Sequence, residues 1–513
     1  MTQVPALPTL WSLVERQASR TPDALLVVDE HGRSLTFGRY RERTEQIAAG
    51  LAARGIGPGT TVAWQLPTSI AAIELVGALA RLGATQVPLL PIYREREVRF
   101  ALRQTRPSLV ITPSVWRGFD HAGLAKQVVA DEGLDAEVLA VDEPMAGGDP
   151  ARLPPPPADA DPVRWVFFTS GTTGEPKGAR HSDATIAAGS LGVAEAYRVT
   201  ESDRYPIVFP FTHIGGIGML FIQLATGAGA IAVEQFDLET TPPLLASHGL
   251  TIAAGGTPLA LLYLQRQRRN PDERMFPDLR ATMTGAAPTP PSLDAELRDE
   301  LGGIGALACY GLTEMPFLTV SSVADTPDHR ARTVGRAVGG AEIRVVDADG
   351  RDVAPGVSGE IWARGPQLCL GYLDAERNAE AFTPDGWLRT GDLGTLDADG
   401  FVTITGRLKD IIIRKGENIS AKEVEDLVFT HPAVADVAVI GLPDDRTGER
   451  CCAVVVPAAG SIAPDLAELA AFCRAAGLAN QKLPEQVEVR DELPRNASGK
   501  VLKFRLRDEL SLT

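Results

Sequence analysis

Aromatic residues and excess positive charge are both scarce in this sequence. Only 6% of the 513 residues are aromatic, which leaves few side chains for stacking on the bases of single-stranded nucleic acid. Asp and Glu number 66 against 50 Lys and Arg, so the formal net charge is −16. A chain this acidic is not expected to depend on contacts with a phosphate backbone, and no nucleic-acid partner is predicted.

Cysteine is rare as well. The sequence has no C-x-x-C pair, and its five cysteines are Cys309, Cys369, Cys451, Cys452 and Cys473. An odd number of scattered cysteines does not indicate a disulfide framework, and a reducing compartment fits, so we expect a cytoplasmic protein. The seven histidines form no H-E-x-x-H pattern, so the sequence gives no support for a zinc enzyme.

Signals for export or for a membrane span are not evident. The N-terminus, MTQVPALPTLWSLVER, lacks a basic stretch followed by an apolar one. Residues Ile214–Val233 carry no charge and are long enough to cross a bilayer, but five glycines and Gln223 interrupt them. This pattern predicts a buried helix from Ile214, a Gly-Ala-Gly turn and a strand over Ala230–Val233. No transmembrane segment is expected.

The N-terminal 110 residues alternate between two hydrophobic periodicities. The length of the chain exceeds what one core usually holds, so at least two domains are expected. The patterns predict helices over Leu10–Ala18, Thr36–Arg54 and Ser69–Leu82, and strands over Ala24–Asp29, Thr61–Leu66 and Ala84–Leu90. Such alternation predicts an α/β fold with a mostly parallel sheet.

The C-terminal third has a different character. Short strands with turn signals begin at Ala341 and predict a small β-rich subdomain. The patterns after it predict helices over Ala421–Phe429 and Pro464–Ala476, and strands over Val434–Leu442 and Cys452–Val456. We place the domain boundary at Gly406–Lys409, giving a large mixed α/β domain over residues 1–406 and a small α+β domain over residues 407–513.

The most informative segment follows a predicted buried strand, Val163–Phe168. It is Thr169–Gly178, with the sequence TSGTTGEPKG. Its glycines let the backbone fold closely around a ligand, its N–H groups and hydroxyls suit an anion, and Lys177 adds a point charge for a phosphate. The spacing is not that of the Walker A motif, because Lys177 is followed by glycine. The segment predicts a phosphate-binding loop of another kind.

Four further motifs follow in order along the chain. They are Tyr310-Gly311-Leu312-Thr313-Glu314, Thr390-Gly391-Asp392, Gly406-Arg407-Leu408-Lys409-Asp410 and Pro494-Arg495-Asn496-Ala497-Ser498-Gly499-Lys500. Together with TSGTTGEPKG they resemble the signatures of the adenylate-forming superfamily, which includes acyl-CoA synthetases, stand-alone adenylation domains and firefly-type luciferases. Five motifs in family order carry far more weight than any one of them.

The resemblance implies an enzyme with two half-reactions that uses ATP, Mg²⁺ and coenzyme A. A carboxylate first attacks the α-phosphate of ATP, which gives an acyl-adenylate and pyrophosphate. A thiol then attacks the acyl carbonyl and releases AMP. The resemblance also implies that the C-terminal domain is mobile and rotates between the two steps.

Residue roles carry over by motif position. The resemblance implies that Lys500 bridges the substrate carboxylate and the α-phosphate, and that Glu314 with Thr169 holds magnesium. It also implies that Asp392 accepts hydrogen bonds from the ribose hydroxyls and that Arg407 contacts the nucleotide. The remaining residues expected at ATP are Ser170, Gly171, Thr172, Thr173, Gly174 and Lys177 at the phosphates, Gly285, Ala286 and Ala287 at adenine, and Tyr310, Gly311 and Thr313 of the second motif.

The acyl group is expected near Phe209–Gly218, which matches the family segment at the acyl pocket. His213 is expected to gate or contact the carboxylate. Amino-acid-activating relatives carry an Asp here for the α-ammonium, and this segment has none, so an apolar acid without an α-amino group is predicted. The expected wall residues are Ile214, Gly215, Met219, Thr257, Cys309 and Met315.

The hinge and the thiol channel are also implied by the resemblance. Lys409 occupies the hinge position, and the loop with Lys415, Gly416 and Glu417 is expected at the thiol channel in the second step. Three alternatives stay open: an enzyme that loads a carrier-protein phosphopantetheine, a luciferase-like oxidase, and a nucleotide-binding scaffold without catalysis. The sequence does not specify the chain length, branching or ring content of the acid, and either a monomer or a homodimer is expected.

Overall fold

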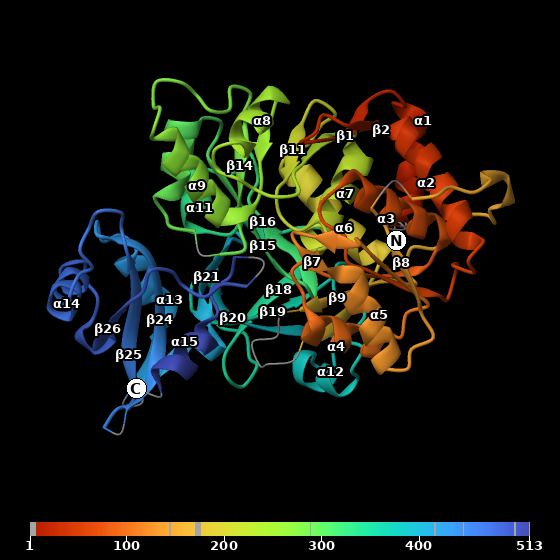
Figure 1. Ribbon diagram of the computed structural model, residues 1–513. Helices are drawn as coiled ribbons and strands as arrows, with labels where there is room; N and C mark the ends of the chain where they lie inside the picture. Colours follow the sequence, from red (N-terminus) through yellow and green to blue (C-terminus); the bar gives the residue numbers. More distant parts are fainter. Residues whose placement is uncertain are drawn as a thin grey trace. The chain divides into compact units, whose positions relative to one another are not determined.

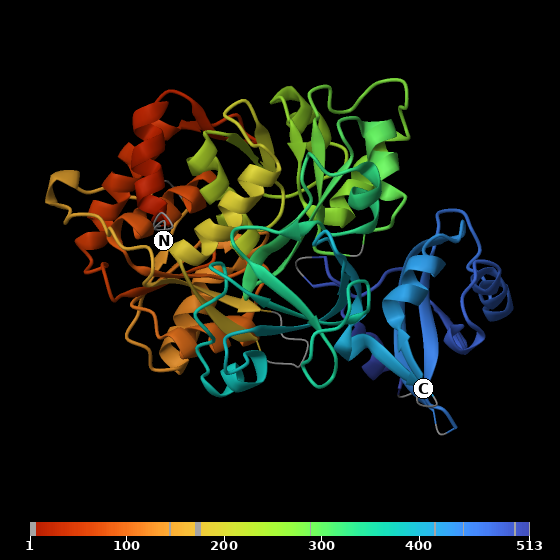
Figure 2. The same cartoon turned by 180° about the vertical axis from the view of Figure 1, so that it is seen from behind.

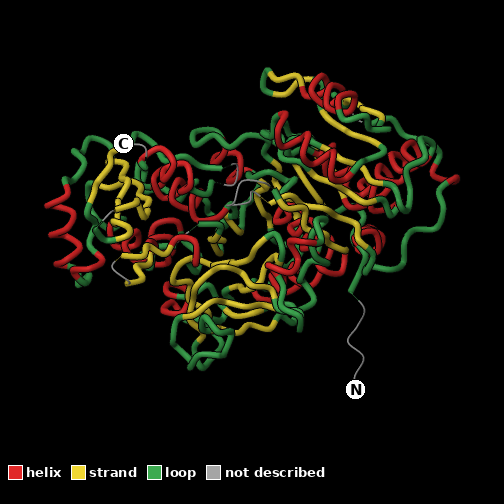
Figure 3. Tube along the Cα trace, turned by 90° about the horizontal axis from the view of Figure 1, so that it is seen from below, coloured by secondary structure: helices red, strands yellow, loops and turns green. Residues whose placement is uncertain are grey.

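The computed structural model describes residues 7–142, 145–169, 176–287, 289–414, 417–444, 446–496 and 499–511. It divides into two compact units, both containing helices and strands (Figures 1 and 3). The first unit comprises Met1–Gly285, Pro291–Glu342 and Arg364–Leu388, and the second comprises Ala286–Pro290, Ile343–Ala363 and Arg389–Thr513. The two units are regions of dense internal contact and do not show where the chain rotates. The domain boundary near residue 406, which was expected as a point of rotation, therefore stays a prediction.

Among the described residues, the first unit contains three sheets of four or more strands and one two-stranded sheet. The six-stranded sheet has the order β10-β9-β4-β3-β5-β8, in which only β10 is antiparallel to its neighbour. Its strands are β3 (Thr61–Trp64), β4 (Thr85–Pro88), β5 (Leu109–Thr112), β8 (Glu137–Ala140), β9 (Val163–Thr169) and β10 (Lys177–Ser182). The parallel core confirms the expectation from strand–helix alternation.

The other two sheets of this unit are mixed. One has the order β11-β12-β1-β2, with β1 (Leu25–Asp29), β2 (Ser34–Thr36), β11 (Arg204–Ile207) and β12 (Gly229–Ala232). The second has the order β13-β14-β15-β16-β17, with β13 (Ile252–Ala253), β14 (Ala281–Gly285), β15 (Ala306–Leu312), β16 (Met315–Val320) and β17 (Arg336–Ala337). A separate hairpin joins β6 (Val115–Trp116) to β7 (Phe119–Asp120).

Four helices of the first unit begin within one residue of their predicted starts, and the others were not predicted. Those of the first half are α1 (Leu10–Arg20), α2 (Phe37–Ala52), α3 (Ile70–Leu82), α4 (Glu95–Thr105), α5 (His121–Asp131), α6 (Asp183–Ala196) and α7 (Ile214–Thr226). They are followed by α8 (Thr241–Ser247), α9 (Gly256–Gln267), α10 (Leu293–Glu296), α11 (Pro327–Arg332) and α12 (Glu376–Ala381). Figure 2 shows α6 and α7 side by side, as Figure 1 does.

Helix α3 shows why these segments are helical. The Ser69 side chain accepts a hydrogen bond from the Ala72 N–H, and Gly83 ends the helix in the left-handed conformation with φ of 67°. Helix α7 begins after His213 and ends at Gly227, so the uncharged stretch is a buried helix followed by β12, as predicted. No helix among the described residues is long and apolar enough to cross a membrane.

The second unit holds most of the β-rich segment and the C-terminal α+β segment. The four-stranded sheet has the order β18-β19-β20-β21, with β18 (Glu342–Val346), β19 (Gly359–Arg364), β20 (Leu388–Leu396) and β21 (Val402–Arg407). The five-stranded sheet contains β22 (Ile411–Arg414), β23 (Glu417–Ser420), β24 (Val434–Asp444), β25 (Gly448–Pro457) and β26 (Gln486–Val489). Its helices are α13 (Ala421–Val428), α14 (Leu466–Ala475) and α15 (Lys503–Leu510).

Candidate active site

The predicted phosphate loop connects two antiparallel strands. Strand β9 ends at Thr169, β10 begins at Lys177, and these two residues are partners in the strand register. The hairpin therefore brings Thr169 and Lys177 together at the base of the loop. The predicted loop residues Ser170, Gly171, Thr172, Thr173 and Gly174 lie outside the described part of the chain.

Glu314 lies in a tight hairpin. Strands β15 and β16 pair Leu312 with Met315, so Thr313 and Glu314 form the turn between them. The Thr313 carbonyl lies 2.8 Å from His181 Nε2, and a carbonyl can only accept, so His181 donates. Burial lowers the pKa of His181 to about 4, which keeps the ring neutral. Sequence reasoning missed His181, which fixes the turn from strand β10.

The Glu314 carboxylate is held by a residue that the motifs did not include. The Tyr372 hydroxyl donates to Glu314 Oε1 at 2.6 Å, and the Cys369 N–H donates to the Glu314 carbonyl at 2.8 Å. Burial and the neighbouring Glu314 carboxylate raise the pKa of Tyr372, so the hydroxyl keeps its proton. Tyr372 is 58 positions from Glu314 in the sequence, and no local spacing signals the pair.

These residues fit the magnesium ion that the resemblance implies. Thr169 and Glu314 offer a hydroxyl and a carboxylate, which are the hard oxygen donors that Mg²⁺ prefers. Within the described residues no group of three or more His, Cys, Asp or Glu side chains is placed to hold a metal. Mg²⁺ commonly takes one or two protein ligands and completes its shell with water and phosphate oxygens, so a sparse protein site fits this ion.

A small pocket lies at the predicted acyl segment. It is lined by Pro88, Leu90, Tyr93, Phe167, Phe168, Thr212, His213, Ile214 and Thr313. Three of these residues, His213, Ile214 and Thr313, were predicted at the site, whereas Leu90, Tyr93 and Phe168 come from other segments. None of the nine lining residues is acidic or basic apart from the histidine.

The His213 ring is neutral in this pocket. Its Nδ1 accepts a hydrogen bond from the Gly215 N–H at 3.1 Å, at the start of helix α7. His213 is an exposed residue, yet desolvation by the surrounding protein atoms lowers the pKa of its ring. Because Nδ1 accepts, the neutral ring carries its hydrogen on Nε2.

The other predicted wall residues do not line this pocket. Met219, Thr257 and Met315 are each at most 2% exposed. Met219 packs in a core cluster with Cys309 among its neighbours, and burial raises the pKa of the Cys309 thiol to about 12. Their assignment to the acyl wall stays a prediction.

The ends of β14 and β15 bring the predicted adenine segment beside the Tyr310 motif. The two strands are parallel and pair Gly285 with Cys309, so Tyr310 and Gly311 follow directly on the neighbouring strand. Gly285 has φ of 136°, and a Cβ there would lie 2.2 Å from the Cys309 carbonyl oxygen, so only glycine fits. Its N–H donates to Thr257 Oγ1 at 3.2 Å.

Two residues just after Gly285 were also predicted at adenine. Ala286 has φ of 61°, which is unusual for a residue other than glycine, and Ala287 follows it. Pro288 lies outside the described residues. The carboxyl ends of adjacent parallel strands are where α/β sheets generally bind ligands.

In the second unit, the sheet holds two predicted nucleotide contacts against each other. Asp392 on β20 and Arg407 on β21 are register partners, and Arg407 Nε lies 2.6 Å from Asp392 Oδ1. Asp392 is 2% exposed, and its N–H donates to Thr390 Oγ1. The ion pair leaves the orientation of the Asp392 carboxylate well defined.

Lys500 lies on a tight turn in the same unit. Arg495 and Val501 form an antiparallel bridge, and the Lys500 N–H donates to Asn496 Oδ1 at 2.9 Å. Burial, followed by the nearby Arg407 guanidinium, lowers the pKa of Lys500 to about 8, while Asp392 and Asp410 oppose this effect. The structure thus brings Lys500 close to Asp392 and Arg407.

The predicted hinge residue lies in a single 3-10 turn, Leu408–Asp410, between β21 and β22. The turn is anchored at its end, because Asp410 Oδ1 accepts a hydrogen bond from Arg507 Nη2 of α15 at 3.0 Å. Of the predicted thiol-channel residues, Lys415 and Gly416 lie outside the described residues, and Glu417 is the first residue of β23.

Comparison with known proteins gives one consistent result. A family model described as "AMP-binding enzyme" matches residues 14–373, and one described as "AMP-binding enzyme C-terminal domain" matches residues 423–500.

Similar proteins cover nearly the whole chain. The medium-chain fatty-acid–CoA ligase of Escherichia coli is 32% identical over 97% of this chain and 89% of its own length. The salicyl-AMP ligase / salicyl-S-ArCP synthetase of Mycobacterium tuberculosis is 32% identical over 98% of this chain and 91% of its own length. Among solved structures, one similar protein is o-succinylbenzoate coenzyme A synthetase from Bacillus subtilis, in complex with ATP and magnesium ion. It has a TM-score of 0.84 and 28% sequence identity, and the match covers 98% of this chain and 99% of that chain. The chain therefore belongs to the AMP-binding enzyme family, the adenylate-forming superfamily that its motifs resemble, and is an AMP-forming acid–thiol ligase.

Proposed function

We propose that this ligase activates an apolar carboxylic acid without an α-amino group and transfers the acyl group to coenzyme A. The observation that carries the proposal is the His213 pocket, whose walls are apolar side chains, Thr212, Thr313 and a neutral imidazole. An α-ammonium placed there has no carboxylate among the lining residues, and an unpaired buried charge is costly. An alkyl, alicyclic or aryl acid meets no such penalty.

In the first step the chain's own residues align two anions. A substrate carboxylate oxygen attacks the α-phosphorus of ATP, the bond to the bridging oxygen breaks, and pyrophosphate leaves. Lys500 places its ammonium between the two anions, and Asp392 with Arg407 holds the ribose and nucleotide. Thr169 and Glu314 would hold magnesium, which would screen the phosphate charge when bound.

In the second step the CoA sulfur attacks the acyl carbonyl carbon. The mixed anhydride bond breaks, AMP leaves with the bridging oxygen, and the thiol proton passes to solvent. We propose that the C-terminal domain, residues 407–513, turns at Lys409 between the two steps, which moves Lys500 away and brings the Lys415–Glu417 loop to the thiol.

A carrier-protein phosphopantetheine is the second candidate for the thiol. Relatives of similar identity include the salicyl-S-ArCP synthetase and pyochelin synthase PchD of Pseudomonas aeruginosa, which favours keeping this acceptor as an alternative. Both acceptors present the same thiol chemistry. They differ in whether free coenzyme A accelerates turnover.

The test is pyrophosphate release from ATP and Mg²⁺ over matched pairs of acids, with and without coenzyme A. Each pair differs only at the α-carbon, such as hexanoate against 2-aminohexanoate and 3-phenylpropanoate against phenylalanine. We expect CoA-dependent turnover on one unsubstituted acid and at least tenfold lower kcat/KM for its amino counterpart. Preference for the amino acid would overturn the substrate class. Slow release that coenzyme A does not accelerate would favour the carrier protein instead.

The pH dependence of the first step gives a further prediction. The pKa of Lys500 is about 8, so the ammonium is present below this pH and is lost as the pH rises through it. We expect kcat/KM for acid-dependent ATP–pyrophosphate exchange to fall above about pH 8, approaching tenfold per pH unit. Lys500→Arg keeps its charge at high pH and should lose this basic limb, at a lower overall rate. If kcat/KM of the Lys500→Arg variant still fell above about pH 8, the fall would have to be assigned to another titrating group.

A further inference from the structure

The segment Cys369–Leu373, here called the 369–373 segment, lies along the edge of strand β10 opposite β9. The Arg180 N–H donates to the Gly371 carbonyl at 3.0 Å, the Leu370 N–H donates to the Arg180 carbonyl at 2.7 Å, and the Leu373 N–H donates to the Gly178 carbonyl at 2.9 Å. Since β10 begins at Lys177, the segment is fixed to the strand that leaves the phosphate loop. It belongs to the first unit, as does β10.

The same segment also reaches the Glu314 turn. One bond is between backbones, from Cys369 to the Glu314 carbonyl, and the other is from the Tyr372 hydroxyl to Glu314 Oε1 at 2.6 Å. A hydroxyl that donates to a carboxylate at this distance forms a strong, charge-assisted hydrogen bond. Among the residues that the structure describes, the second carboxylate oxygen, Oε2, receives no hydrogen bond and no ion pair. One oxygen is therefore held and the other is left for a ligand.

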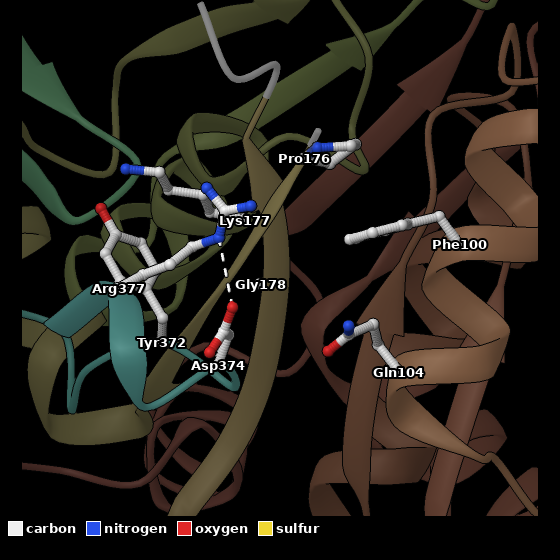
Figure 4. A pocket seen from close by; sticks show the side chains of 8 residues that line it. All are labelled: Phe100, Gln104, Pro176, Lys177, Gly178, Tyr372, Asp374 and Arg377. Atoms are coloured by element: carbon white, nitrogen blue, oxygen red, sulfur yellow. Dashed lines mark hydrogen bonds and ion pairs between the residues drawn. The ribbon is translucent and has the colours of Figure 1, made fainter. Parts of the chain in front are cut away.

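Tyr372 contacts Lys177 as well. Lys177 Nζ lies 5.1 Å from the centre of the Tyr372 ring, a cation–π distance. Both residues line a pocket in which Lys177, Tyr372 and Arg377 gather on one wall and Phe100 and Gln104 of α4 form the opposite wall (Figure 4). Tyr372 is 4% exposed, so its ring is fixed by packing, and the hydroxyl has a defined direction.

We propose that Tyr372 is a positioning residue for the first half-reaction. Its hydroxyl fixes the Glu314 carboxylate so that Oε2 faces the magnesium–triphosphate, and the 369–373 segment keeps this carboxylate in register with the strand that carries Lys177. The inference rests on the proposed role of Glu314 as the magnesium ligand. Tyr372 touches neither substrate nor metal and acts through Glu314.

Tyr372→Phe removes only the hydroxyl and keeps the ring beside Lys177. The measurement is ATP binding by calorimetry without acid, once in excess Mg²⁺ and once in EDTA. We expect the gain in ATP affinity that Mg²⁺ provides to fall by at least fivefold, while metal-free binding stays within twofold of the parent. An equal loss in both conditions, or no loss in either, would overturn the proposal.

Tyr40→Phe is the matched control. Tyr40 is fully buried, and its hydroxyl donates to the Ile73 carbonyl at 3.0 Å in another part of the first unit, at a site that contains no predicted ligand-binding residue. This variant also loses one buried hydrogen bond, so it should lower the melting temperature by a similar amount. Its Mg²⁺-dependent gain should equal that of the parent, and a reduced gain would mean that general destabilisation explains the Tyr372 result.

Glu314→Gln separates the two proposals. In the Glu314→Gln background, Tyr372→Phe should change the Mg²⁺-dependent gain in ATP affinity by less than a further twofold. The reason is that the carboxylate through which Tyr372 acts is already absent. A full additional loss would contradict action through Glu314. If Glu314→Gln alone leaves the gain intact, the magnesium role of Glu314 fails, and that failure is visible whatever Tyr372→Phe does.

Discussion

Lys500→Ala should abolish acyl-adenylate formation while leaving ATP binding within a few-fold of the parent. The substrate carboxylate and the α-phosphate are both negative, and the ammonium is the group that allows them to approach. Removing one preorganised charge from a transition state of this kind costs about 10²–10³ in rate, and two repelling anions place this case at the upper end. The measurement is acid-dependent ATP–pyrophosphate exchange, with ATP binding followed by calorimetry.

Two controls make this result specific. Lys482→Ala makes the same truncation in the same unit at a lysine paired with Glu423 at the surface, and it should exchange pyrophosphate at the parent rate. Synthetic acyl-adenylate supplied with coenzyme A should still give thioester in the Lys500→Ala variant, because the second step does not use this ammonium. Exchange at the parent rate in Lys500→Ala would remove Lys500 from the first step.

The fold was most predictable where local signals agree. The segment from Ser69 to Gly83 has a capping serine, an apolar run and a terminal glycine, and the helix spans Ile70–Leu82 as expected. Strand ends were less predictable, because β3 stops at Trp64 although the apolar pattern continues to Leu66. Strand β10 was not predicted, since KGARHS has little alternation and becomes a strand through its pairing with β9.

The sequence predicted which residues belong to the site, but it did not predict the contacts between them. Asp392 and Arg407 were each expected at the nucleotide, yet their 2.6 Å ion pair depends on the register of β20 and β21. His181 and Tyr372 hold the Glu314 turn from β10 and from the 369–373 segment. Contacts of this kind arise from tertiary pairing, and a single sequence carries no local signal for them.

The acyl group is the least predictable feature for the same reason. The His213 pocket draws its walls from the end of β4, the segment after it, the end of β9, the start of α7 and the Glu314 turn. Each segment contributes one to three residues, so the shape of the pocket depends on how these strands and this helix begin and end. The absence of an acidic residue near His213 was readable from the sequence, and the pocket walls agree with it.

Lys409→Pro should slow thioester formation much more than adenylation. The residue lies in the 3-10 turn Leu408–Asp410, between the Arg407–Asp392 ion pair on one side and the Asp410–Arg507 hydrogen bond on the other. A turn fixed at both ends concentrates any rotation in the few dihedral angles between them. Proline locks φ near −65°, which suits a 3-10 turn and prevents its change.

The conformation that proline would lock is the one described, in which Lys500 lies close to Asp392 and Arg407. On the proposed mechanism, adenylation uses Lys500 together with Asp392 and Arg407, so we expect pyrophosphate exchange to fall by less than about threefold. Part of this loss would come from the restriction that proline places on the backbone of Leu408. Thioester formation from acyl-adenylate and coenzyme A should fall by at least tenfold, because the C-terminal domain could then no longer turn at Lys409. Lys409→Ala leaves the dihedral angles free and should keep both steps within about threefold. An equal loss of both steps in Lys409→Pro, with Lys409→Ala unaffected, would mean that the turn stabilises the C-terminal domain without serving as its hinge.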